Sequence, residues 1–220
     1  MSRDDKSYKR KKKGVQPQPL FLITCEGEKT ENYYFSEFPY CNSLGAANQL
    51  GQYYLTNAVY IKKAAGQHCG VVDTARTVFL ELKKRGLLIK PQDVWCVFDC
   101  DNDIDSTRQA VERAHILGYN SIYSIQCFEL WYLLHYQELN GVVNKEEYDK
   151  KISQYIGQEY SHEIKGMYKT LFEQQTDAIR RAERLWNNAD RDGDLFCDPV
   201  TNVHILVEAL NKAHANRYKG

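Results

Sequence analysis

The chain lacks the features that define several classes of protein. No apolar stretch approaches the roughly 20 residues needed to cross a bilayer, and the polar N-terminal segment has no apolar core like that of a signal peptide. The seven cysteines include no CxxC pair, which argues against a disulfide framework. Neither His68 with Cys69 nor Cys96 with Cys100 completes the four ligands of a zinc site. We therefore expect a cytoplasmic protein that makes no contact with a membrane.

The chain also has no net charge, but its charges are unevenly distributed. Residues 1–13 hold seven Lys or Arg against two Asp, a balance of +5, so the remainder carries −5. A basic arm on an acidic body is typical of proteins that contact a polyanion, and also of tails that serve only to solubilise a protein. We expect residues 1–17 to form a basic, disordered tail in which Lys11, Lys12 and Lys13 are candidate nucleic-acid contacts.

Residues 20–136 alternate between apolar runs and helical patterns. The apolar runs predict strands at residues 20–25, 53–61, 94–98 and 121–125. Helical spacing predicts helices at about 30–38, 72–84, 106–117 and 128–136, with Ser106 or Asp105 capping the third. This order is typical of an α/β fold with a mostly parallel sheet, right-handed crossovers and helices on both faces.

The last third of the chain has a different pattern. Leu171, Ala178, Ala182 and Leu185 keep helical spacing, residues 187–199 are rich in Asp, Asn and Gly, and a last helix follows Thr201. We therefore predict an α/β domain over residues 18–140 and a helical extension over residues 141–220 that packs on it. Residues 187–199 are expected to be a loop.

Acidic side chains follow the first and third predicted strands. Glu26 and Glu31 come after the first strand, and Asp99, Asp101 and Asp103 come after the third. Because parallel strands place their carboxyl ends at one edge of a sheet, these side chains should converge in a ligand-binding crevice. Carboxylates held together repel unless a cation neutralises them, and oxygen-only ligands suit Mg²⁺ or Mn²⁺. The pattern predicts a site for one or two such ions and chemistry on phosphate.

Neighbouring residues add to this candidate site, and each also has a simpler explanation. Gly27 would let a phosphate approach the backbone closely, and Lys29 would contact phosphate near a helix N-terminus. Glu26 alone could be a solvated acid at a strand end. Glu31 and Glu129 each open a predicted helix, where the helix dipole by itself favours a carboxylate.

The same residues carry a family resemblance. Glu26-Gly27 and Asp99-x-Asp101 resemble the Toprim domain of topoisomerases, primases and OLD-type nucleases, and the spacing from Glu26 to Glu31 is most similar to the OLD-type branch. Three segments extend the likeness to RloB (AbiLii-type) proteins over residues 20 to about 212: CEGEKTE at 25–31 followed by Tyr34-Phe35, FELWYLLH at 128–135, and PVTNVH at 199–204.

The resemblance implies a role for each candidate residue. Glu26 would act as a metal ligand or general base, Asp99 and Asp101 as the metal-binding pair, and Glu31 as the second OLD-type glutamate. Asp103 would be a further ligand or simply a loop acid, and Glu129 would reach the same crevice in support. Lys165, in a segment that resembles a lysine segment of RloB-like proteins, would neutralise charge on a leaving phosphate.

The resemblance also implies an activity and partners. Such proteins are Toprim-like factors of abortive-infection or anti-phage loci, typically encoded beside an AAA-type ATPase. The leading hypothesis is therefore a nuclease, dependent on Mg²⁺ or Mn²⁺, that hydrolyses DNA or RNA. The alternatives are primase-like nucleotidyl transfer, a receiver-like phosphoacceptor module, and a non-catalytic regulator of the ATPase that binds metal or nucleic acid.

Overall fold

The computed structural model describes residues 20–41, 59–64 and 66–217. A four-stranded, all-parallel sheet runs through it in the order β2-β1-β3-β4. The strands are β1 (Phe21–Cys25), β2 (Val59–Lys63), β3 (Val94–Asp99) and β4 (Asn120–Ser124). The predicted α/β fold with a parallel sheet is confirmed. The predicted tail at 1–17, with Lys11, Lys12 and Lys13, and residues 53–58 of the second predicted strand lie outside the described residues.

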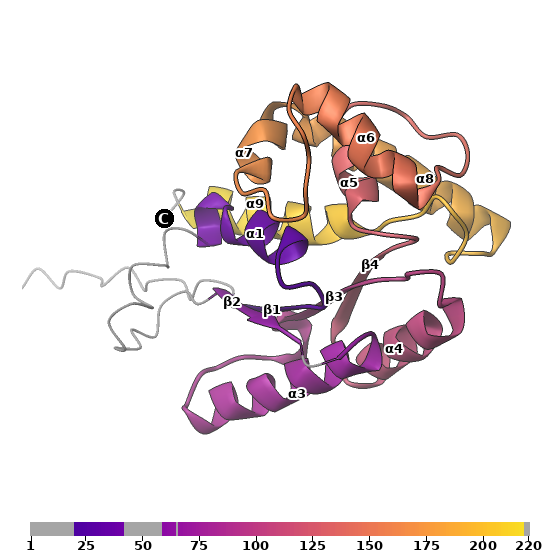
Figure 1. Ribbon diagram of the computed structural model, residues 1–220. Coiled ribbons are helices and arrows are strands. Elements are labelled where there is room, and N and C mark those ends of the chain that lie inside the picture. The colour runs from indigo at the N-terminus through magenta and orange to yellow at the C-terminus, as the bar shows by residue number, and fades with distance from the viewer. Residues whose placement is uncertain (1–19, 42–58, 65, 218–220) are drawn as a thin grey trace, which may run out of the picture.

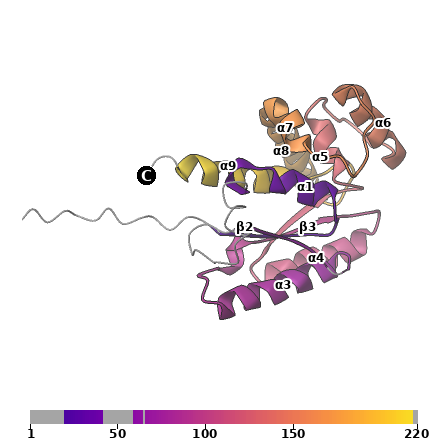
Figure 2. The same cartoon turned by 60° about the vertical axis from the view of Figure 1, so that its left-hand side comes forward.

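Helices cover both faces of this sheet, as predicted (Figure 1). The long helices α3 and α4 lie on one face, while α1 and α9 lie on the other and α5 to α8 stack beyond them (Figure 2). The helices are α1 (Thr30–Ser36), α3 (Cys69–Lys84), α4 (Ile104–Ile116), α5 (Glu129–Leu134), α6 (Lys145–Ile156), α7 (Met167–Leu171), α8 (Gln175–Asp192) and α9 (Val203–Arg217), with short 3₁₀ turns at Pro91–Asp93 and Phe172–Gln174.

The central strand β1 is buried throughout because both of its faces are covered, and only Thr24 among its residues is polar. All five of its residues are buried. Phe21 and Ile23 contribute to the core under α1, α5 and α9, while Leu22 contributes to the core under α3 and α4. Continuous hydrophobicity of this kind distinguishes a covered parallel strand from a half-exposed one.

The turn after β3 differs from the prediction. Helix α4 begins at Ile104, and its N-cap is Asp103, whose Oδ1 accepts a hydrogen bond of 3.0 Å from the backbone N–H of Ser106. The expected caps, Ser106 and Asp105, were wrong. Asp101 and Asn102 adopt left-handed backbone conformations with φ of 45° and 63°, which asparagine and aspartate tolerate better than most residues. This tight turn places Asp103 at the helix start.

The predicted loop at residues 187–199 was also wrong in its first part, because α8 continues to Asp192. Ala189 is buried and extends the apolar stripe of Ala178, Ala182 and Leu185 by one more turn. The polar residues that suggested a loop, such as Asn187 and Asn188, lie on the exposed side of the helix.

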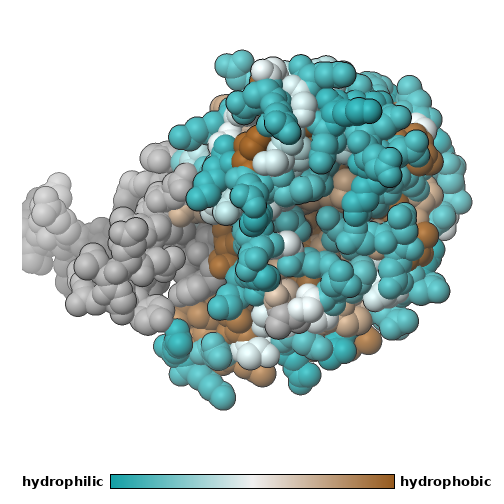
Figure 3. Space-filling view, in the orientation of Figure 1, coloured by the Kyte–Doolittle hydropathy of each residue, from teal (hydrophilic) through white to brown (hydrophobic). Residues whose placement is uncertain are grey.

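The helical extension shares its core with the sheet. One cluster of buried residues runs from Ile23 in β1 through Trp131 in α5 to Leu185 in α8 and Leu206 in α9. On the face drawn in Figure 3, hydrophilic residues dominate the surface and hydrophobic ones form small scattered groups. Within the described part of the chain, no helix is long and apolar enough to cross a membrane.

Candidate functional site

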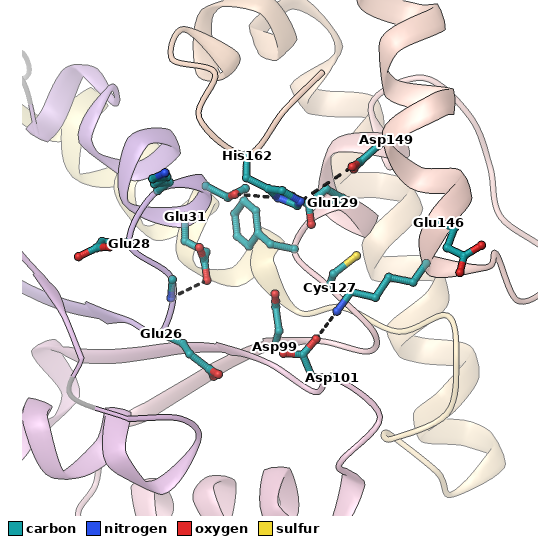
Figure 4. Close-up of a pocket in the computed structure, with 15 residues that line it drawn as sticks. Glu26, Glu28, Glu31, Asp99, Asp101, Cys127, Glu129, Glu146, Asp149 and His162 are labelled. Carbon is teal, nitrogen blue, oxygen red and sulfur yellow. Dashed lines mark hydrogen bonds and ion pairs between the residues drawn. The ribbon is translucent and has the colours of Figure 1, made fainter. Parts of the chain in front are cut away.

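A pocket of about 520 Å³ opens at the carboxyl ends of β1 and β3, between the sheet and the helical extension (Figure 4). Its walls come from the β1–α1 turn, the β3–α4 turn, the start of α5, helix α6 and the loop after α6. The lining side chains are strongly acidic, with Lys29, Lys145 and His162 set against eight carboxylates: Glu26, Glu28, Glu31, Asp99, Asp101, Glu129, Glu146 and Asp149.

Asp99 lies at the bottom of this pocket, enclosed by protein but partly accessible through the opening. Its enclosure, together with the nearby carboxylates of Glu31 and Glu129, holds its pKa well above the usual range. Burial, together with the carboxylates of Glu129 and Glu26, raises the pKa of Glu31 to about 7. The side chains of Asp99, Glu31 and Glu129 come from different elements, so the fold brings together carboxylates that repel one another.

The β1–α1 turn places Glu26 and Glu31 on the same side of the pocket. The backbone N–H of Gly27 donates a 3.2 Å hydrogen bond to Glu31 Oε1. A Cβ atom at position 27 would collide with that carboxylate, so any other residue there would push the Glu31 side chain out of this position. Glu26 is half-buried, burial raises its pKa, and its Oε2 lies 3.5 Å from the backbone N–H of His68.

Asp101 and Asp103, two residues apart, point to different partners. Asp101 lines the pocket and forms an ion pair with Lys145 of α6. Asp103 lies outside the pocket lining, and its carboxylate caps α4. Asp101 therefore lies with the candidate metal ligands, whereas Asp103 stabilises the start of α4.

The two candidate lysines are also separated. Lys29 lines the pocket and forms an ion pair with Glu163, which lies in the loop between α6 and α7. Lys165, from the same loop, lies outside the pocket with Nζ 5.0 Å from the centre of the Tyr33 ring. In this conformation Lys29, and not Lys165, is the lysine placed to contact a bound phosphate.

The carboxylates have the chemistry of a site for a hard divalent cation, but they do not form a closed cluster. Among residues 20–41, 59–64 and 66–217, no three His, Cys, Asp or Glu groups stand close enough to hold a metal ion in their present side-chain conformations. The raised pKa of Asp99 and of Glu31 shows that negative charge at the bottom of the pocket is poorly compensated. Oxygen ligands in that state suit Mg²⁺ or Mn²⁺.

Sequence reasoning missed several residues of the pocket. Lys145, Glu146 and Asp149 come from α6, and His162 comes from the following loop, more than 40 residues after the turns that carry Asp99 and Asp101. The segment around His162 was noted in the sequence only for Lys165. These side chains reach the pocket through the packing of α6 on α5, which no local sequence pattern reports.

A single family model covers the acidic turns after β1 and β3, helix α5 and Thr201. The model of the RloB-like proteins matches residues 21–210. The chain belongs to the RloB-like family. The RloB-like region spans the whole sheet, every residue that lines the pocket and the first half of α9. No curated protein and no solved structure gives a significant match to the chain.

Proposed function

We propose that this RloB-like protein is a nuclease that depends on Mg²⁺ or Mn²⁺ and acts with an AAA-type ATPase in anti-phage defence. The observation that carries the proposal is the position of Asp99 at the bottom of an acidic pocket, where burial and the carboxylates of Glu31 and Glu129 raise its pKa. The relation to Toprim nucleases rests on the sequence motifs, and the ATPase and the defence role rest on the family resemblance.

Three carboxylates, those of Glu31, Asp99 and Asp101, would hold the cation, with Glu26 beside them. Glu31 and Asp99 lie deepest, and Glu26 and Asp101 stand closer to the opening. A divalent cation in such a site supplies charge neutralisation and polarises a phosphoryl oxygen of the substrate. With eight carboxylates against two lysines and one histidine, the pocket would otherwise repel a nucleic-acid backbone, so we expect substrate binding there to require bound cations.

The remaining residues have roles that follow from their positions. Glu26 is half-buried with a raised pKa, which suits a general base that takes a proton from the attacking water. Lys29 at the pocket wall would contact a phosphate next to the scissile one, and Lys11, Lys12 and Lys13 supply further positive charge for nucleic acid. Glu129 accepts hydrogen bonds from neighbouring side chains and would support the site rather than bind metal.

A receiver-like phosphoacceptor is less well supported. A simple receiver has neither the Asp99-x-Asp101 spacing nor a long helical extension. Here Asp101 lines the pocket beside Asp99, and the extension supplies the opposite wall through α6 and the loop after it. A non-catalytic regulator of the ATPase would use the same cation site without cleaving nucleic acid.

The test is a cleavage assay with purified protein on supercoiled DNA, single-stranded DNA and bulk tRNA, in Mg²⁺, in Mn²⁺ and in excess chelator. We expect cation-dependent cleavage of at least one substrate by the wild type, and loss of that cleavage in Asp99→Asn and Asp101→Asn. Asp105→Asn is the matched control because Asp105 is exposed in the first turn of α4, outside the pocket. No cleavage of any substrate by the wild type would favour the regulator.

A further inference from the structure

His162 stands in the pocket wall opposite the sheet and belongs to a hydrogen-bonded group from which the proposed function draws only on Glu129, as a supporting residue. Its Nδ1 lies 2.9 Å from Glu129 Oε1, and the same oxygen accepts a 2.7 Å hydrogen bond from the hydroxyl of Tyr160. The Oγ1 of Thr30 lies 3.4 Å from His162 Nδ1. The imidazole is therefore held in one orientation by residues of α1 and α5.

Glu129 is the charged partner in this group. Only 3% of its surface is exposed, and burial alone would raise its pKa. The hydrogen bonds from His162 and Tyr160 outweigh that effect and lower the pKa below its usual value. Glu129 therefore remains ionised, and a buried carboxylate of this kind strongly favours a positive charge on the histidine beside it.

The groups that face His162 come from each of the elements around it, and only some of them are charged. The hydrogen bond to Glu129, aided by the negative charge of Asp149 on α6, raises the pKa of His162 against the opposing effects of partial burial and of Lys145. Tyr160, from the same loop, and Thr30, from α1, are neutral neighbours. The net effect keeps the imidazole protonated at higher pH than an ordinary histidine.

The second N–H of the protonated ring is available to a ligand. His162 Nε2 is within ion-pair distance of Asp149 Oδ2, at 3.9 Å, but does not form a hydrogen bond with it. The His162 side chain is 59% exposed and lines the pocket. Figure 4 shows it on the helical side of the carboxylates, with Glu26 on the sheet side. A phosphodiester bound between them would have a base on one side and a proton donor on the other.

We propose that His162 protonates the leaving oxygen of the phosphodiester, with Glu129 as its positioning residue. This inference rests on the proposed nuclease function. As the oxygen of water forms its bond to phosphorus, a water proton passes to the Glu26 carboxylate. The phosphorus–oxygen ester bond breaks, its electron pair stays on the leaving oxygen, and that oxygen takes the Nε2 proton of His162. Neutral imidazole then regains a proton from solvent, and Glu26 releases one.

The leaving group of the substrate tests this role directly. An alkoxide leaving from a sugar is strongly basic and needs a proton, whereas p-nitrophenolate leaves without one. The assay compares wild type, His162→Gln and His115→Gln on the nucleic acid that the wild type cleaves fastest and on the p-nitrophenyl ester of thymidine 5′-monophosphate. His115 is exposed on α4, outside the pocket, and is the matched control.

We expect His162→Gln to cleave the nucleic acid about 100-fold or more slowly than the wild type, yet to cleave the p-nitrophenyl ester within a few-fold of it. His115→Gln should match the wild type on both. Equal losses on the two substrates, or undiminished cleavage of nucleic acid by His162→Gln, would overturn the assignment. If the wild type cleaves neither substrate in Mg²⁺ or Mn²⁺, the nuclease proposal itself fails and this inference falls with it.

A pH profile gives an independent reading. Activity of the wild type on nucleic acid should fall on the alkaline side as His162 loses its proton, and this limb should be absent in the residual activity of His162→Gln. Glu129→Gln should move the limb to lower pH because the imidazole loses its negative partner. An alkaline limb that is unchanged in His162→Gln would assign it to another group and contradict the proposal.

Discussion

At the scale of single residues, the turn after β3 separates acids that look equivalent in the sequence. Asp101 reaches the pocket and pairs with Lys145, whereas Asp103 turns back to cap α4. The grouping of Glu26, Glu31, Asp99 and Asp101 could be predicted because each follows a strand end, and parallel strands share one edge. The capping role of Asp103 could not be separated from metal binding, because it depends on two left-handed residues before it.

The ion pair between Lys145 and Asp101 should weaken cation binding, because the ammonium group already neutralises one of the candidate ligands. Both side chains are partly exposed, so the pair is worth only about 0.2–1 kcal/mol. We expect Lys145→Gln to bind Mn²⁺ up to about fivefold more tightly than the wild type in a calorimetric titration. Lys151→Gln, which breaks the pair of the same helix with Glu147, should have no effect. Weaker binding by Lys145→Gln would contradict this account.

His135 should make the protein sensitive to acid. Burial lowers its pKa to about 4, and its Nδ1 lies 2.9 Å from the carbonyl oxygen of Trp131, a contact that requires the proton on Nδ1 of the neutral ring. In the unfolded chain this histidine takes up a proton near pH 6.5. The free energy of unfolding therefore has its full value above that pH and decreases as the pH falls towards 4.

Urea denaturation at pH 7 and pH 5 measures this effect. His135→Gln should lose about 2 kcal/mol less free energy of unfolding between the two pH values than the wild type does. The comparison concerns the change with pH, so a general destabilisation by the substitution does not affect it. An equal loss in both proteins would show that His135 is not buried in the neutral form.

At the scale of elements, the edge of the sheet at β4 is closed by a side chain at the start of α9. Oδ1 of Asn202 accepts a 2.7 Å hydrogen bond from the backbone N–H of Tyr123, and its Nδ2 donates to the carbonyl of Ser121 at 3.0 Å. These contacts occupy backbone groups that an unprotected edge strand would leave open. The strands and their order along the chain could be predicted from their apolar runs. This link could not be predicted, because it joins Asn202 to residues that lie 79 and 81 positions earlier in the chain.

Removing that link should destabilise the whole protein. Asn202→Ala leaves one buried and one partly buried backbone group on β4 without their side-chain partner, so we expect the free energy of unfolding to fall by about 2 kcal/mol. Asn187→Ala, on the exposed side of α8, should change it by less than about 0.5 kcal/mol. Urea denaturation of the two variants measures the difference, and similar small effects would argue against a structural role for Asn202.

At the scale of the whole molecule, the pocket exists only where the sheet and the helical extension meet. The sheet side provides Glu26, Asp99 and Asp101, and the extension provides Lys145 and His162. From the sequence we predicted an α/β domain and a helical extension. The acidic residues of the α/β domain could also be predicted, because they lie near strand ends. The contribution of the extension depends on how its helices pack on α5, which is a long-range property of the fold. The central claim is that the assembled pocket binds a divalent cation.

Calorimetric titration of the purified protein with Mn²⁺ at pH 7.5 or above tests that claim most directly. The account predicts saturable binding by the wild type, binding weakened at least about tenfold in Asp99→Asn, and unchanged binding in Asp105→Asn. All three proteins should show the same cooperative unfolding without metal, so that lost binding cannot be ascribed to lost folding. Absence of saturable binding by the wild type, or equally tight binding by Asp99→Asn, would contradict the assignment of this pocket as a metal site.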